Sequence, residues 1–179
     1  MILFRDIPGR TNIKEKLAAK IRDKKPGHAY IFEGPEGCGK KDFAQAFANM
    51  ILCTSPNSEK PCGKCRHCSI RNAGGNGELY LVEEEKRSIS VETVRQLQDN
   101  ISLMPVSSDS KVYIIADGDK MTRQAQNCLL KTLEEPPPYA YIIITASNGD
   151  KFIETIKSRA GQGQIGTNTI EEILSYLNC

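Results

Sequence analysis

The stretch GPEGCGKK has the residue types and spacing of a phosphate-binding loop. Gly34, Gly39 and Lys40 match the pattern G-x-x-x-x-G-K-[ST], and Gly37 gives the backbone further freedom to curl around an anion. Lys40 would neutralise the phosphate oxygens of a nucleotide. The pattern ends in a hydroxyl that holds Mg²⁺, but this chain has Lys41 there. The stretch therefore predicts a phosphate cradle that lacks its magnesium ligand, and it leaves open whether ATP still binds.

Four of the seven cysteines are clustered with the spacing C-x8-C-x2-C-x2-C, as Cys53, Cys62, Cys65 and Cys68. Four thiolates with no open position are typical of a structural Zn²⁺ site. The odd total number of cysteines argues against a disulfide scaffold. His67 could replace one of the thiolates, and an iron–sulfur cluster also takes four cysteines. We expect a structural zinc ion here, with these two alternatives open.

The elements that must position these residues follow an alternating pattern. Runs rich in β-branched and aromatic residues predict strands at 29–32, 79–83, 112–116 and 141–145. Helices are expected between them: Asn12, Ser90 and Thr122 can each cap one, and the phosphate loop leads into another at 42–52. Strands that alternate with helices form βαβ units and a parallel sheet. The predicted fold class is α/β, a parallel sheet flanked by helices with a small zinc-binding insertion at 53–77.

Two segments interrupt this pattern. Residues 54–77 are rich in glycine, cysteine, serine and asparagine and form the predicted insertion. Residues 161–168 are expected to form a loop, because they hold mainly glycine, glutamine and threonine. Thr169 and Glu172 then make a capping box for a helix at 170–177. We expect one domain at 1–165 and, at 166–179, the start of a truncated second domain.

Composition excludes several classes of protein. Charged residues make up 26% of the 179 residues, but the net charge is only +2, so the chain has no global basic field of the kind that binds nucleic acid. No apolar run approaches the roughly 20 residues that a membrane span needs. The N-terminus lacks the pattern of a secretory signal. We expect a cytoplasmic protein without membrane contact.

The motifs together resemble one family. The segments HAYIFEGPEGCGK, KVYIIADGDKMTRQAQNCLLKTLEEPP and SR, combined with the four-cysteine insertion, resemble the bacterial clamp-loader subunits of DNA polymerase III. These are AAA+ proteins, and the resemblance covers nearly the whole chain. It implies an AAA+ P-loop domain. Two kinds of subunit are candidates, the gamma/tau ATPase motor and the delta prime subunit, whose ATPase motifs are usually degraded.

The second acidic motif bears on this choice. In the motor subunits the third strand ends in Asp-Glu, where the Asp helps to hold Mg²⁺ and the Glu polarises water. Counted back from LLKTLEEPP, the two positions fall on Ala116 and Asp117, or on Asp117 and Gly118 after a slip of one residue. Either way one member is missing, in addition to the change at Lys41. We expect Asp117 and Asp119 to cap a loop instead.

The resemblance also assigns a role to Arg159. Ser158 and Arg159 match the family's Ser-Arg-Cys motif, with Ala160 in place of the cysteine. In the family this arginine is a finger that reaches the ATP of a neighbouring subunit. A guanidinium suits that role, because its fixed fork can meet γ-phosphate oxygens in pairs. A chain that hydrolyses nothing could therefore still act in trans.

The resulting prediction is the N-terminal region of a non-hydrolysing delta prime subunit. The resemblance implies gamma/tau and delta subunits as partners, with the sliding clamp and primed DNA contacted through the assembled complex. The label DNA-directed DNA polymerase belongs to the holoenzyme, since nothing in this chain predicts polymerisation. The fragment alone is expected to be monomeric. An active gamma/tau-type ATPase remains the main alternative, beside a P-loop kinase and a zinc module that binds nucleic acid directly.

Overall fold

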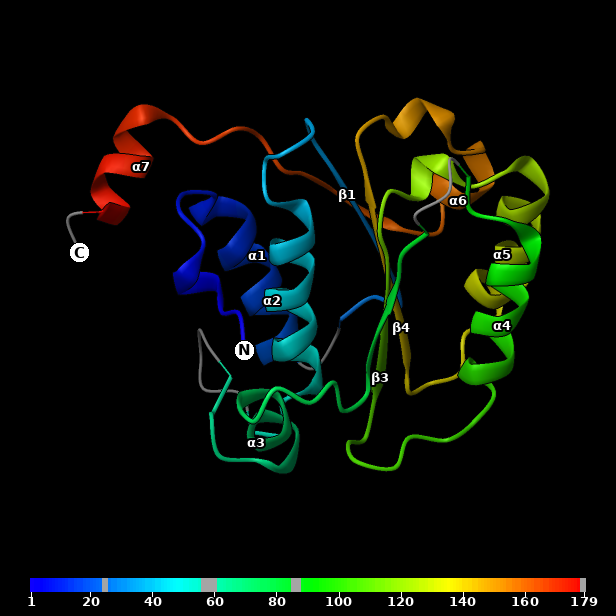
Figure 1. Ribbon diagram of the computed structural model, residues 1–179, viewed down its shortest axis with the longest axis horizontal. Helices are drawn as coiled ribbons and strands as arrows, with labels where there is room; N and C mark the ends of the chain where they lie inside the picture. Colours follow the sequence, from blue (N-terminus) through cyan, green and yellow to red (C-terminus); the bar gives the residue numbers. More distant parts are fainter. Residues whose placement is uncertain (24–25, 56–60, 85–87, 178–179) are drawn as a thin grey trace.

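Five parallel strands form a single sheet in the order β2-β3-β4-β1-β5. The computed structural model describes residues 1–23, 26–55, 61–84 and 88–177 (Figure 1). The strands are β1 (Ala29–Glu33), β2 (Leu79–Val82), β3 (Lys111–Ile115), β4 (Ala140–Ala146) and β5 (Gly161–Gln164). The α/β fold class and the four predicted strands are confirmed. β1 lies between β4 and β5, and because all the strands are parallel, the loop after β1 opens at the carboxyl edge of the sheet, where such folds bind ligands.

Helices cover both faces of this sheet. One face carries α1 (Thr11–Arg22) and α2 (Lys40–Leu52), and the other carries α4 (Val91–Ile101), α5 (Arg123–Glu134) and the short α6 (Glu154–Lys157) (Figure 1). Short 3₁₀ turns lie at Phe4–Asp6, Gly118–Lys120 and Gly149–Lys151. The sheet is therefore the middle layer of three.

Strand β1 divides its side chains between two cores. Tyr30 and Phe32 pack in the core on the α1–α2 side, whereas Ile31 packs in the core on the α4–α5 side. Phe32 meets the ring of Phe43 on α2 edge to face, with centroids 5.1 Å apart. Burial of each such side chain stabilises the fold by about 1.5–3 kcal/mol. This packing fixes α2, and with it the phosphate loop, against the centre of the sheet.

Two predicted helix caps are confirmed and one is wrong. The side chains of Ser90 and Thr122 accept hydrogen bonds from the backbone N–H groups of Thr93 and Ala125, at the starts of α4 and α5. Asn12 does not cap α1. That helix begins at Thr11, two residues earlier than a cap at Asn12 would place it, and its N-cap is Arg10, which has a left-handed backbone with φ 61°.

The predicted loop at 161–168 is partly wrong. Its first residues form β5, which pairs in parallel with β1 from Tyr30↔Gly161 to Glu33↔Gln164. The sequence GQGQ has no apolar side chain to indicate a strand. Backbone pairing with an already buried neighbour makes this strand, so the residue pattern of the segment does not predict it.

The predicted insertion contains a helix, α3 (Arg66–Asn72), at the amino edge of the sheet (Figure 1). The capping box of α7 (Ile170–Leu177) is present, because Thr169 N–H donates to the Glu172 carboxylate and Glu172 N–H donates to the Thr169 hydroxyl, at 2.8 and 3.2 Å. α7 lies outside the three layers (Figure 1). Within the described part of the chain, no helix is long and apolar enough to cross a membrane.

Candidate functional site

The phosphate loop joins the carboxyl end of β1 to the first turn of α2. Gly37 and Gly39 have left-handed backbones, with φ of +73° and +80°, and a Cβ at either would meet no described atom within 4 Å. These two glycines are therefore needed for the left-handed backbone of the loop, and the space beside them is open to a ligand. A cavity of about 600 Å³ lies against the loop, lined by residues 36–39, by Arg10 and by Asn168 among others. A glycine-rich loop between a parallel strand and a helix N-terminus is an arrangement typical of phosphate and nucleotide binding.

Gly34 serves a different purpose, which is close packing. A Cβ at this position would lie 2.0 Å from the carbonyl oxygen of Ile165. The chain after β5 is fixed there, because Ile165 N–H donates to the Glu33 carbonyl at 2.6 Å and Gly34 N–H donates to the Ala146 carbonyl at 3.1 Å. The loop is thus held between β4 and the segment that leads to α7.

We expect Gly34→Ala to lower the free energy of unfolding by about 1–3 kcal/mol, the usual cost of overpacking, because its new methyl would collide with backbone. Gly166→Ala is the matched control, since a Cβ there meets no described atom within 4 Å. Urea unfolding followed by circular dichroism measures both variants. Equal unfolding midpoints for the two would contradict the close contact at Gly34.

Lys40 is buried and its ammonium is held by the loop itself. The Nζ atom donates to the carbonyls of Gly34 and Pro35 at 2.8 and 2.7 Å and to the Ser147 hydroxyl at 3.3 Å. Ser147 lies just after β4, in a polar stretch where the sequence does not single out one residue. Pairing of β4 with β1 is what brings this hydroxyl to the loop.

Lys41, at the position of the expected hydroxyl, forms an ion pair with Glu83. Glu83 follows β2, so the pair reaches across the carboxyl ends of the strands. Sequence reasoning missed Glu83, because no motif relates a residue after β2 to the phosphate loop. The structure therefore places a protein cation and its carboxylate partner at the position where the pattern requires a magnesium ligand.

The acidic residues after β3 are held in a turn. Asp117 has a left-handed backbone with φ 50°, and its carboxylate pairs with Lys120 at 2.8 Å. The side chain of Asp119 is nearly buried. It accepts a hydrogen bond from Ser147 N–H at 3.2 Å and pairs with Lys151 at 3.3 Å. These contacts agree with the predicted loop-capping role.

Arg10 is a second residue that sequence reasoning missed. Its Nη2 atom donates to the carbonyl of Cys38 in the phosphate loop and to the carbonyl of Gly166, the latter at 3.0 Å. The side chain thus connects the N-terminal segment, the loop and the chain that leads to α7. The only sequence signal is the dipeptide before it, Pro8-Gly9, which is typical of a turn.

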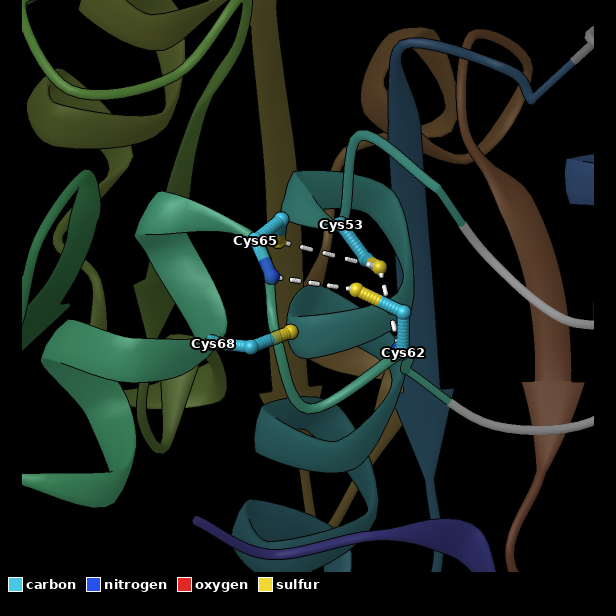
Figure 2. A group of neighbouring side chains, drawn as sticks. All are labelled: Cys53, Cys62, Cys65 and Cys68. Carbon is cyan, nitrogen blue, oxygen red and sulfur yellow. Dashed lines mark hydrogen bonds between the residues drawn. The ribbon is translucent and has the colours of Figure 1, made fainter.

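The four clustered cysteines lie together at the opposite end of α2. Their Sγ atoms are all within 4.8 Å of one another, and those of Cys53 and Cys65 are 4.0 Å apart (Figure 2). A tetrahedral ion with metal–sulfur bonds of about 2.3 Å needs sulfur atoms about 3.8 Å apart. Figure 2 shows the sulfurs of Cys53, Cys62 and Cys68 turned toward one centre. This cluster can hold a metal ion.

Backbone groups help to form thiolates in this cluster. The N–H of Cys62 points at the sulfur of Cys53, at 3.2 Å, and the N–H of Cys65 at the sulfur of Cys62, at 3.3 Å. Burial opposes ionisation of Cys65, but hydrogen bonds from the backbones of Cys68 and Thr54 outweigh it and lower its pKa to about 6. Burial raises the pKa of Cys53 and of Cys68. A bound cation would deprotonate those two thiols as well.

His67 points into the protein core and away from a ligand role. Its ring is fully buried, and its Nε2 lies 3.4 Å from the side-chain oxygen of Asn49, whose nitrogen donates to the carbonyl of Ile2 at 2.9 Å. Since that oxygen can only accept, Nε2 carries the proton. Burial, with the nearby charge of Arg71, lowers the pKa of His67 to about 4. The neutral ring therefore fastens α3 to α2.

The two sites are separated by the length of α2. Thirteen residues at 1.5 Å each give a helix about 20 Å long. A metal in the cysteine cluster is therefore too far from the phosphate loop to act on a bound nucleotide. Its role would be to hold the insertion in place.

Arg159 lies on the surface at the end of α6, and its described partners come from α5 and α6. It pairs with Glu134 at 2.8 Å and donates to the carbonyl of Thr155 at 3.0 Å. None of these contacts joins it to the phosphate loop of its own chain. This placement is compatible with a role toward another molecule.

The fold, the loop and the cysteine cluster together define an AAA+ domain with an inserted four-cysteine module. A family model described as "DNA polymerase III, delta subunit" matches residues 9–169. The chain therefore belongs to the family of DNA polymerase III clamp-loader subunits, which confirms the predicted resemblance.

Relatives of both candidate subunit types are similar to this chain. The tau/gamma subunit of Haemophilus influenzae is 36% identical over 159 residues, which cover 89% of this chain and 23% of the relative. The delta' subunit of Bacillus subtilis is 35% identical over 147 residues, which cover 82% of this chain and 44% of the relative. The chain thus spans less than half the length of these relatives, and similarity alone does not separate the two types.

Solved structures support the fold. A gamma subunit-related protein of Thermotoga maritima aligns with a TM-score of 0.67 and 23% identity, over 90% of this chain and 48% of that chain. The RuvB Holliday junction branch migration motor of Thermotoga maritima aligns with a TM-score of 0.62 and 13% identity, over 99% of this chain and 52% of that chain. At these identities the likeness concerns the fold alone.

Proposed function

We propose that this chain is the N-terminal AAA+ region of a delta prime-type clamp-loader subunit that does not hydrolyse ATP itself. The observation that carries the proposal is the ion pair between Lys41 and Glu83, which stands where hydrolysis needs a hydroxyl and Mg²⁺. The second acidic motif is also incomplete, and Asp117 is engaged with Lys120. Both changes affect the same metal chemistry.

The proposal keeps the domain limits expected from the sequence. Residues 1–165 form the AAA+ domain, with the zinc module at 53–77, and residues 166–179 begin a further domain. Buried Ile165 and exposed Gly166 support a boundary at this point. In the assembled complex the chain would sit beside gamma/tau and delta subunits, and the complex would open the sliding clamp and place it on primed DNA.

Arg159 is the residue proposed to act on another subunit. Arg159 is exposed, and its ion pair with Glu134 lies at the surface, so the side chain is able to turn toward a neighbour. There its guanidinium would stabilise the charge that develops on the γ-phosphate of the neighbour's ATP.

The metal proposed for the cysteine cluster is Zn²⁺. Four sulfur ligands at distances that suit a tetrahedral ion favour a structural zinc site, because no position is open for substrate. Zinc would supply folding energy to a segment with few apolar residues of its own.

An ATPase assay tests the proposed function. We expect the chain to release no phosphate from ATP above the buffer blank, with a tau/gamma relative as the active control. Lys41→Thr alone is expected to stay inactive, because Asp117 and Asp119 remain paired with lysines. Turnover by the unmodified chain at the rate of the control would overturn the proposal and favour the alternative, a gamma/tau-type motor that retains the glycines and Lys40.

A further inference from the structure

Three carboxylates at or near the carboxyl edge of the sheet are each neutralised by a lysine. Glu83 pairs with Lys41, Asp117 with Lys120 and Asp119 with Lys151. The first carboxylate follows β2 and the other two follow β3, so they border the region in front of the phosphate loop. The three lysines come from three separate elements, Lys41 from α2 and Lys120 and Lys151 from two different 3₁₀ turns, so no single sequence motif supplies them.

This arrangement does not fit Mg²⁺. The ion requires near-octahedral oxygen ligands at about 2.0–2.1 Å, and in nucleotide sites it uses a carboxylate together with phosphate oxygens. Here an ion would have to displace an ammonium group from whichever of these three carboxylates it used. Asp119 is further held by its hydrogen bond from Ser147 N–H. The loop also lacks the hydroxyl that would complete the coordination.

The same region does fit phosphate. Lys40 and Lys41 bring two ammonium groups to the first turn of α2, and the left-handed glycines open the loop backbone toward the cavity of about 600 Å³. Two side-chain atoms of residues that line this cavity, Arg10 Nε and Asn168 Oδ1, are buried and have no hydrogen-bond partner among the described residues. The cavity is also lined by Asp6, Glu36 and Asp42 and by neither lysine, so a ligand that places donor groups in the cavity and its phosphates at the loop would complement this wall.

We propose that this loop binds a nucleoside diphosphate or triphosphate without Mg²⁺, and that the ammonium of Lys41 takes over the charge-neutralising role of the metal. The inference rests on the proposed function, since a site that must not hydrolyse has no need of a metal-activated phosphate. Lys41 would exchange its partner, releasing Glu83 and turning to the terminal phosphate. A lysine is a point charge that can make this change by rotation of its flexible chain.

Calorimetric titration with ADP, once with EDTA and once with excess Mg²⁺, tests this inference on the chain. We expect binding in both buffers with the same dissociation constant. Lys41→Met, which removes the ammonium without supplying a hydroxyl, is expected to weaken binding in EDTA by about tenfold, the value of one charge-assisted contact of about 1.4 kcal/mol, and Mg²⁺ should not restore it. Lys16→Met, at an exposed lysine on α1, is the matched control and should bind as the unmodified chain does.

Glu83→Gln is expected to change the affinity for ADP in the opposite direction. Removal of this carboxylate frees Lys41, so affinity for ADP in EDTA should rise. If Glu83 instead held a metal, the variant would lose affinity only in Mg²⁺, which would overturn the inference. Thermal melts of each variant establish that a lost signal does not reflect unfolding.

Two further outcomes would overturn the inference. One is tightening of ADP binding by about tenfold or more when Mg²⁺ is added, which corresponds to about 1.4 kcal/mol. The other is the absence of ADP binding in both buffers by a chain that melts cooperatively. Neither outcome affects the proposed lack of hydrolysis, which only phosphate release from ATP would contradict.

Discussion

Cys65→Ser is expected to abolish stoichiometric zinc binding and to unfold the inserted module while the AAA+ sheet stays intact. Cys65 is one of four cysteines whose sulfurs lie within 4.8 Å of one another, and hydrogen bonds from the backbones of Cys68 and Thr54 lower the pKa of its thiol to about 6. Structural zinc contributes roughly 10–16 kcal/mol of apparent binding energy in small peptides. A module of this size cannot replace that energy from its own core.

Two measurements follow this loss. Metal analysis should give one zinc per unmodified chain and none per Cys65→Ser chain. Hydrogen exchange should show loss of protection in α3, because this helix begins directly after Cys65 and carries Cys68. Protection in β3 and β4 should persist, since those strands pack in the two main cores.

Cys128→Ser is the matched control for this prediction. Cys128 lies on α5, outside the cluster, and its sulfur faces the side-chain oxygen of Gln98 at 3.2 Å, a contact that a serine hydroxyl can also make. This variant should keep its zinc. Full zinc content in Cys65→Ser would contradict the four-sulfur site, and visible absorption typical of iron–sulfur centres in the unmodified chain would identify the alternative metal.

The fold was predictable to the extent that side chains encode it. Buried strands such as β3 and β4 are nearly continuous apolar runs, and Ser90 and Thr122 mark helix starts through local hydrogen bonds. β5 was not predictable, because its GQGQ sequence is made a strand only by pairing with β1. The start of α1 was misplaced for a similar reason, since Arg10 makes its contacts with distant parts of the chain.

The residues of the candidate site also fall into a group that the sequence predicts and a group that it does not. Contiguous motifs predicted the phosphate loop and the cysteine cluster, because spacing along the chain determines their local geometry. Glu83, Ser147 and Arg10 reach the phosphate loop only through the order of strands in the sheet. Sequence reasoning on one chain has no access to such contacts, and the inference about lysine and Mg²⁺ depends on them.

The proposed function has two parts, the lack of ATP hydrolysis by this chain and the action of Arg159 on a neighbouring subunit. The two parts can be tested separately, because the described contacts of Arg159 lie away from its own phosphate loop. If hydrolysis belongs to a neighbouring subunit, the contribution of this chain must come from a surface group that can reach that subunit. Arg159 is exposed, and its partner Glu134 lies at the end of α5. Glu134 holds the guanidinium in place before assembly, and the more highly charged phosphate would compete with it.

Arg159→Ala is therefore expected to lower the ATP turnover of the neighbouring subunit in the assembled complex by about 10³–10⁵-fold, the usual effect of an arginine finger. Arg159→Lys should not rescue it, because an ammonium lacks the planar fork that meets two oxygens at once. Lys157→Ala, two residues away and also ion-paired on α6, is the matched control and should leave turnover unchanged. Steady-state phosphate release from complexes of verified subunit composition is the measurement, with the full-length subunit carrying each change. Unchanged turnover in an intact Arg159→Ala complex would remove Arg159 from the neighbour's site and leave this domain with a purely architectural role in the ring.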